Sequence, residues 1–299
     1  ERRLERWTRS GPFAESSLLR LLIHETWFRV AFIGFLGLLL FLALFLPKIW
    51  SNAPKGFHTD LPVSGLDYLQ AWAQKRTALK AMAANRPEEA MLAWRGALAN
   101  TPGNPEISRG MLRFLLSTET KKEFLGHAYY RAGWLLELTR TNRADVALVA
   151  SVYEKYQLYE PLLVLLKPFE NDLDEARESS YLKALFRTGR VEAFAQRLER
   201  SGPKRPQDPE LPLYEAAYLA GWGPADRREA AQRKLSEALD VVSLRYLACR
   251  LLLAVGRQTE NLPQFEQALD RLYEWRVDTS ADHANHWRFL SGLNRKAEA

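Results

Sequence analysis

The chain has 299 residues, enough for one large helical array or two ordinary domains. Hydrophobic residues make up 47% and charged residues 26%, which excludes a disordered chain, and the mean hydropathy of −0.31 confines any membrane segment to one part of the sequence. The net charge is +6, but Lys and Arg are interleaved with Asp and Glu, without an arginine tract, an RNP-like motif or a zinc spacing. We therefore expect no nucleic-acid partner.

An apolar run near the amino terminus predicts a transmembrane helix over residues 30–50. Val30 to Leu46 contains no charged or strongly polar side chain, and as a helix it covers about 25 Å. Trp27 and Trp50 lie on either side of the run, where interfacial aromatic residues are common. A buried core helix would show a polar face, which this run lacks. A cleaved signal peptide is the competing interpretation, but the long segment before the run favours an uncleaved anchor in the bilayer.

The basic residues around this run predict its orientation. The amino-terminal side carries six arginines: Arg2, Arg3, Arg6, Arg9, Arg20 and Arg29. The other side has only Lys48 and Lys55 before Asp60. The positive-inside rule then places residues 1–29 in the cytoplasm, as an arm, and the rest of the chain outside it, at a bacterial inner (plasma) membrane.

Two features of this amino-terminal part suggest further contacts. The leucine-rich stretch 16–27 fits an interfacial helix on the inner leaflet, and equally well a continuation of the membrane helix. Within the run, Ala31, Gly34 and Gly37 form a patch of small residues where another membrane helix can approach, although a GxxxG spacing is absent.

A Pro-, Gly- and Ser-containing linker over 51–65 precedes a stretch with helical periodicity. Within it, Ala90, Trp94 and Ala97 are spaced four and three residues apart and share one helix face, and Pro102 ends that helix. This small–large–small face closing on a proline resembles the second helix of a tetratricopeptide (TPR) repeat. The resemblance implies an all-α fold that binds other proteins.

The same register extends over residues 66–277 as about six helix pairs. Ala231, Leu235 and Ala238 repeat the spacing of the first unit in a fifth one. In the sixth unit we expect Gly256 in the turn and Cys249 at the small position. Residues 278–299 fit a capping helix for the exposed end of a solenoid. An irregular α-solenoid of helix pairs without TPR register is the alternative.

The sequence predicts neither an enzyme nor a cofactor or metal site. It contains no P-loop, no GxGxxG after a strand, no HExxH and no GxSxG. His283 and His286, beside Asp282, have the spacing of metal ligands, but a third ligand is missing. Cys249 is the only cysteine, so neither an intramolecular disulfide nor a cysteine-based metal site is expected.

In TPR register, Trp72, Lys75, Leu79 and Met82 would face the concave side of the first unit, where they suit a partner helix or an extended peptide. A partly solvated helix face is the alternative. In layout the chain resembles bacterial inner-membrane TPR proteins of envelope assembly and cytochrome c maturation. Two functions follow as expectations: a membrane-anchored scaffold or adaptor for other proteins at the extracytoplasmic face, or a permanent accessory subunit of a multi-subunit membrane complex.

Overall fold

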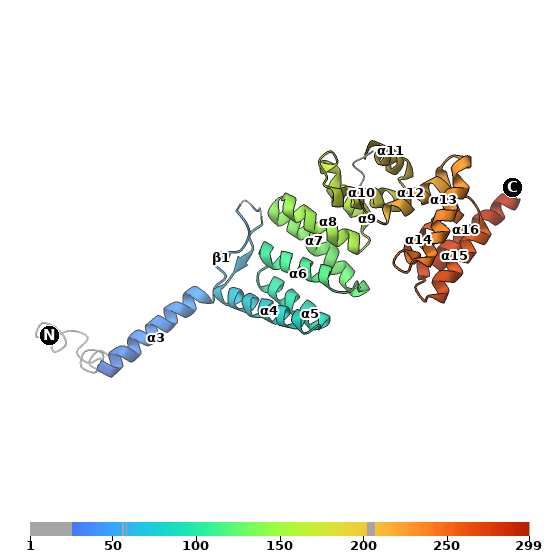
Figure 1. Cartoon of the computed structure of the whole chain (residues 1–299). Helices are drawn as coiled ribbons and strands as arrows, with labels where there is room; N and C mark the ends of the chain where they lie inside the picture. Colours follow the sequence, from blue (N-terminus) through green and yellow to red (C-terminus); the bar gives the residue numbers. More distant parts are fainter. Residues whose placement is uncertain (1–25, 56, 58, 202–206, 299) are drawn as a thin grey trace, which may run out of the picture. The chain divides into compact units, whose positions relative to one another are not determined.

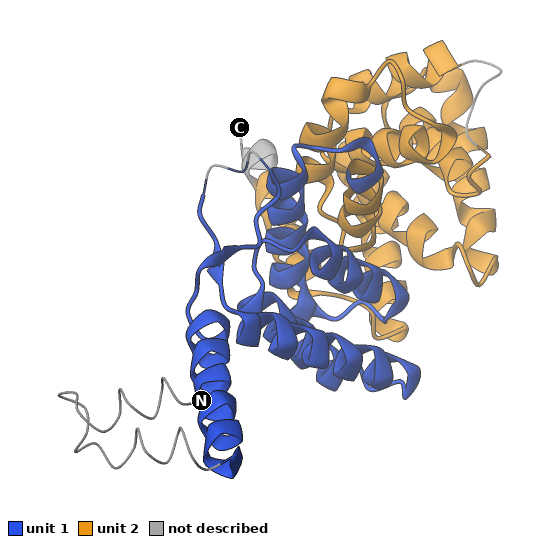
Figure 2. Cartoon of the chain, turned by 90° about the vertical axis from the view of Figure 1, so that its left-hand side faces the viewer, with its two compact units in different colours: residues 1–145 blue, residues 146–299 orange. Residues whose placement is uncertain are grey.

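The structure, a computed structural model, describes residues 26–55, 57, 59–201 and 207–298 (Figure 1). The arginines before residue 26 and nearly all of the expected interfacial stretch 16–27 lie outside the described residues. The chain divides into two compact units, residues 1–145 and 146–299 (Figure 2). The described part holds fourteen α-helices, three short 3-10 helices and one two-stranded sheet, so the expected helical fold is confirmed.

Helix α3, Thr26–Phe45, is one apolar helix with no buried residue. It is the one helix in the described part that is long and apolar enough to cross a membrane, and a signal sequence near the amino terminus would have the same length and composition. Its bounds correct the expected range 30–50, because Trp50 belongs to a strand and the helix ends before Pro47. Proline lacks the amide hydrogen and disfavours helical geometry in the residue before it.

A small hairpin follows within the expected linker. Strand β1, Trp50–Ser51, pairs antiparallel with β2, Pro62–Val63, so the chain returns to the end of α3. Helix α4, Gly65–Ala83, then begins with a capping box in which Ser64 and Asp67 satisfy each other's backbone amides.

Alanine-rich contacts join α4 to α5, Pro87–Asn100, across a short turn in which Asn85 has a φ of 54°. Ala78 of α4 and Ala90 and Ala97 of α5 are fully buried, which lets the two helix axes approach closely. The Trp94 ring is 1% exposed and lies against Gly110 of the next helix, where an added Cβ would come within 2.5 Å of the ring.

Three more helical segments complete the first unit: α6, Pro105–Ser117; η1, Lys122–Phe124; and α7, Leu125–Thr139. Helix α6 packs against both α5 and α7. Ala128 and Ala132 of α7 are fully buried, and the Trp134 indole donates a hydrogen bond of 2.8 Å to the carbonyl of Pro102. Pro102 therefore ends one helix and accepts a bond from a later one.

The second unit begins within α8, Arg143–Lys155, whose first residues belong to the first unit. The remaining segments, in chain order, are α9 Tyr159–Leu166, η2 Lys167–Phe169, α10 Glu175–Arg187, α11 Val191–Ser201, α12 Leu211–Trp222, α13 Ala225–Glu237, η4 Ala238–Asp240, α14 Arg245–Gln258, α15 Leu262–Glu274 and α16 Ser280–Glu298. Helix α10 packs against α9, α11 and α12, and α14 packs against α12, α13 and α15. Phe186 stands edge-to-face with Phe194, Tyr214 and Trp222 at 5.4–5.8 Å between ring centres, which ties α10, α11 and α12 together.

One turn differs from the expectation. Gly256 lies inside α14 rather than between helices, and the turn falls at Thr259 to Asn261, where Glu260 has a φ of 55°. A Cβ added at Gly256 would lie 3.0 Å from the backbone nitrogen of Phe265, so this glycine permits close packing of α14 on α15. Cys249 is buried nearby and its thiol donates to the carbonyl of Ala268 at 3.0 Å.

Candidate functional site

The residues expected to face a partner lie on α4, with different exposures. Trp72 is 54% exposed and Leu79 48%, whereas Lys75 and Met82 are half-buried. Met82 lines a cavity of about 340 Å³ between the end of α4 and the end of α6. The structure therefore places Trp72, Lys75 and Leu79 on one outward side of α4, and Met82 at the edge of a separate hollow. Their role in binding a partner stays a prediction.

The small residues of the apolar helix α3 lie on open surface. Ala31, Gly34 and Gly37 are exposed, and a Cβ added at either glycine would meet nothing within 4 Å. Another helix therefore has room to approach α3 at these positions.

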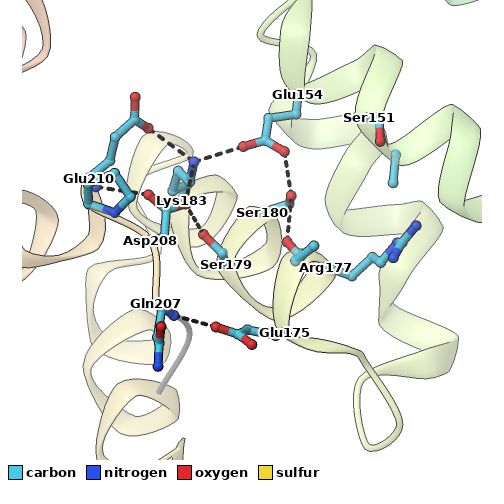
Figure 3. Close-up of a pocket in the computed structure, with 13 residues that line it drawn as sticks. Ser151, Glu154, Glu175, Arg177, Ser179, Ser180, Lys183, Gln207, Asp208 and Glu210 are labelled. Atoms are coloured by element: carbon cyan, nitrogen blue, oxygen red, sulfur yellow. Dashed lines mark hydrogen bonds and ion pairs between the residues drawn. The ribbon is translucent and has the colours of Figure 1, made fainter. Parts of the chain in front are cut away.

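The structure itself suggests another site, a cavity of about 620 Å³ in the second unit (Figure 3). Its walls are α8, α10 and the segment that leads into α12. Ten of the thirteen lining residues have polar side chains: Ser151, Glu154, Glu175, Arg177, Ser179, Ser180, Lys183, Gln207, Asp208 and Glu210. The sequence analysis did not identify this site.

Lys183 lies at the centre of this wall, and its side chain is only 10% exposed. Its ammonium contacts Glu154 of α8 at 2.9 Å, Asp208 at 2.9 Å and Glu210 at 3.0 Å (Figure 3). One turn earlier on α10, the Ser179 hydroxyl donates to Asp208 and the Ser180 hydroxyl to Glu154. The buried charge is thus surrounded by ion pairs that join three separate segments of the fold.

These contacts keep both the Lys183 ammonium and the Asp208 carboxylate in their charged forms. Burial alone would lower the pKa of Lys183, but the hydrogen bonds that its ammonium donates to Asp208 and Glu154 outweigh burial and raise the pKa well above its usual value. Burial would raise the pKa of Asp208, yet the Ser179 hydroxyl and the Lys183 ammonium lower it overall. Lys183 therefore stays charged at neutral pH and is unsuited to act as a base or nucleophile.

Among the described residues that line the cavity, carboxylates outnumber cations. Its lining carboxylates are Glu154, Glu175, Asp208 and Glu210, against the two cations Lys183 and Arg177, and Arg177 is also bound to Asp174 just outside the cavity. Glu175 is exposed and one of its oxygens accepts from the backbone of Gln207 at 2.6 Å. Such a wall suits a ligand that presents a cation and hydrogen-bond donors.

The histidines singled out in the sequence pair separately with carboxylates. His283 contacts Asp278 at 2.8 Å and His286 contacts Glu266 at 3.3 Å, whereas Asp282 is bound to Arg250. Within the part of the chain that the structure describes, no group of three or more His, Cys, Asp or Glu side chains is arranged to hold a metal ion.

One sequence feature indicates the cavity that the sequence analysis missed. Lys183 is the charged residue in the segment YLKALF, residues 181–186 of α10, and the structure buries this whole segment. A lysine inside a fully buried stretch requires carboxylate partners, because an unpaired buried charge is strongly unfavourable.

No known family model matches this chain. No curated protein is significantly similar to it in sequence. The candidate sites therefore depend on geometry and charge alone.

Proposed function

We propose that this protein is a membrane-anchored helical-repeat adaptor of TPR type, with α3 as its anchor and the helices from α4 onward as a solenoid that binds other proteins. Packed pairs of successive helices in the described chain support this proposal: α4–α5, α6–α7, α10–α11, α12–α13 and α14–α15, followed by α16. Burial of Ala90, Trp94 and Ala97 supports TPR-like packing in the first pair.

The observation that carries the proposal is the polar cavity of the second unit. It is large enough for one or two side chains of a protein ligand, and its carboxylates outnumber its cations. Lys183 already neutralises part of this charge, while Glu175 stays exposed at the rim. We therefore expect the adaptor to take a segment of a partner that presents lysine or arginine.

A matched pair of substitutions tests this binding mode on the full chain in mild detergent. Ser151→Arg places a bulky cation in the cavity without removing a partner of Lys183, whereas Ser236→Arg makes the same change on the exposed face of α13. An arginine-rich peptide and a glutamate-rich peptide of equal length serve as probes in fluorescence anisotropy. The proposal requires that the arginine-rich peptide binds preferentially and that Ser151→Arg, unlike Ser236→Arg, weakens its binding several-fold. Equal binding of both peptides would exclude the cavity as a cation-selective site.

A permanent accessory subunit is the second candidate function. The open surface around Gly34 and Gly37 supports it, because membrane helices approach each other closely at small residues. Gly34→Leu with Gly37→Leu keeps α3 apolar while filling this surface. In an accessory subunit the variant still inserts but no longer co-purifies with its complex. Co-purification at the wild-type level would favour the adaptor.

We place the solenoid outside the cytoplasm. The arginines before residue 30 and the scarcity of basic residues directly after the span support this orientation.

A further inference from the structure

Helix α4 has an outward face whose chemistry is unusual for a water-exposed helix. The face opposite its buried alanines carries Leu69, Trp72 and Leu79, each close to half exposed. Between them lie the exposed cations Arg76 and Lys80. The side of a helix that faces solvent is normally polar. In α4 the side opposite the buried alanines is apolar and aromatic, which indicates a second partner besides α5.

The charge on this face has one sign. Lys75, Arg76 and Lys80 all belong to α4, and the one acidic residue in the sequence Gly65–Ala83 is Asp67. Asp67 is bound to Ser64 in the capping box and lies at the start of the helix. The Arg76 guanidinium stands 4.8 Å from the centre of the Trp72 ring, so cation and aromatic ring form one surface. A surface of leucine, tryptophan and basic residues without acids is complementary to anionic lipid headgroups.

The first turn of α4 is held beside the end of the apolar helix α3 (Figure 1). The pairing of β1 with β2 returns the chain to this point, since Trp50 lies opposite Val63. The Phe45 ring, at the last residue of α3, occupies the space beside Gly65, where an added Cβ would lie 2.2 Å from it. Lys48 contacts Asp67 at 4.0 Å. The length and composition of α3 fit a membrane span, and with α3 in a bilayer, α4 would begin where that bilayer ends.

We propose that the outward face of α4 is a membrane-contact surface, with Leu69, Trp72 and Leu79 in the interfacial region of the bilayer and Lys75, Arg76 and Lys80 on anionic headgroups. A bilayer is favoured over a protein ligand for two reasons: the surface is continuous with the membrane helix, and its charge is uniformly positive. The contact lays α4 along the membrane and holds the following helices close to it. This inference requires α3 to stay in the bilayer and assigns Trp72, Lys75 and Leu79 to lipid instead of a protein partner, but it is independent of what the cavity of the second unit binds.

Site-directed fluorescence on the full chain in nanodiscs tests the contact. In a Cys249→Ala background, the exposed residues Ala73 and Ala83 of α4 are replaced by cysteine one at a time and labelled with an environment-sensitive dye. Ala193→Cys in α11 is the matched control at another exposed alanine. Nitroxide-bearing lipid should quench the α4 labels several-fold more than the control, and more strongly in anionic than in zwitterionic discs.

A second variant separates lipid binding from other causes. Reversing all three charges, with Lys75→Glu, Arg76→Glu and Lys80→Glu, should abolish the preference for anionic discs and most of the quenching, while circular dichroism shows an unchanged helix content. Quenching no greater than at Ala193, or quenching unaffected by charge reversal, would overturn the proposal. So would release of the chain from the disc, or protection of the α4 labels that requires a co-purifying protein.

Discussion

Removing the charge of Lys183 should destabilise the second unit in a way that depends on pH. Lys183→Met keeps most of the side-chain volume but leaves Glu154, Asp208 and Glu210 without their common cation. Breaking a fully buried ion pair costs about 3–5 kcal/mol of unfolding free energy. The Asp208 side chain is 19% exposed, but those of Glu154 and Glu210 are 31% and 41% exposed, so water compensates part of the loss. We expect a loss of about 2–3 kcal/mol at neutral pH.

The direction of the pH dependence follows from the carboxylates. In the wild type the pKa of Asp208 is lowered, so its stabilising contribution is present above the unfolded pKa and is lost as the pH falls through the folded one. In Lys183→Met the Asp208 carboxylate stays partly buried without the ammonium that helps to lower its pKa, so its folded pKa rises relative to the wild type. The variant therefore loses less stability than the wild type as the pH falls toward about 4, and the difference between their unfolding free energies should narrow. The pKa of Lys183 itself is raised from an already high value, so its charge does not change in this range.

Urea denaturation of the full chain in mild detergent, followed by circular dichroism at neutral and at acidic pH, measures both effects. Lys167→Met is the matched control, because Lys167 is exposed in the same unit. Combining Lys183→Met with Asp208→Asn should recover part of the loss at neutral pH by removing one unpaired charge. A deficit that stays the same at both pH values would refute the electrostatic explanation and leave lost packing as the cause.

Three further predictions follow from the first unit. Ala97→Leu should lower the free energy of unfolding by about 1–3 kcal/mol, because Ala97 is fully buried between packed helices. Ala99→Leu, on the exposed side of the same helix, should change it little. A urea midpoint of Ala97→Leu equal to that of the wild type would contradict this packing. Gly110→Ala should lower the thermal midpoint by pushing on the Trp94 ring, and the effect should shrink in a Trp94→Ala background if that contact is its cause. Reporter fusions after residue 60 should be active only outside the cytoplasm; activity of a cytoplasmic reporter at that point would reverse the proposed orientation.

Features that depend on short-range spacing could be predicted from the sequence. The shared face of Ala90, Trp94 and Ala97 is buried, because a helical period of 3.6 residues fixes which side chains lie together. The turn between α10 and α11 contains Gly189 at a φ of 78°. Such a positive φ favours glycine over other residues, so the turn has a local sequence signal.

The sequence-based prediction of the turn at Gly256 was wrong, because glycine serves both in turns and at close contacts between helices. A glycine near a helix end suggests a turn, but Gly256 provides close contact between two helices, and the turn uses Glu260 instead. The hairpin at Trp50 and Val63 was also missed. Its strands are two residues long, too short for the alternation that identifies a strand.

The cavity around Lys183 could not be predicted, because its geometry depends on the register between helices. The partners of Ser180, Lys183 and Ser179 lie 26, 27 and 29 residues away in the sequence. The sequence around Lys183 shows that its charge needs a carboxylate, but many acidic residues are available on the neighbouring helices. Which of them reach the ammonium, and which stay exposed as Glu175 does, depends on how α8 and the start of α12 align with α10. The alignment of the helices determines which carboxylates have no cation beside them, and these carboxylates set the charge that the cavity presents to a ligand. A shift of one helical turn would therefore change the binding properties without changing the fold.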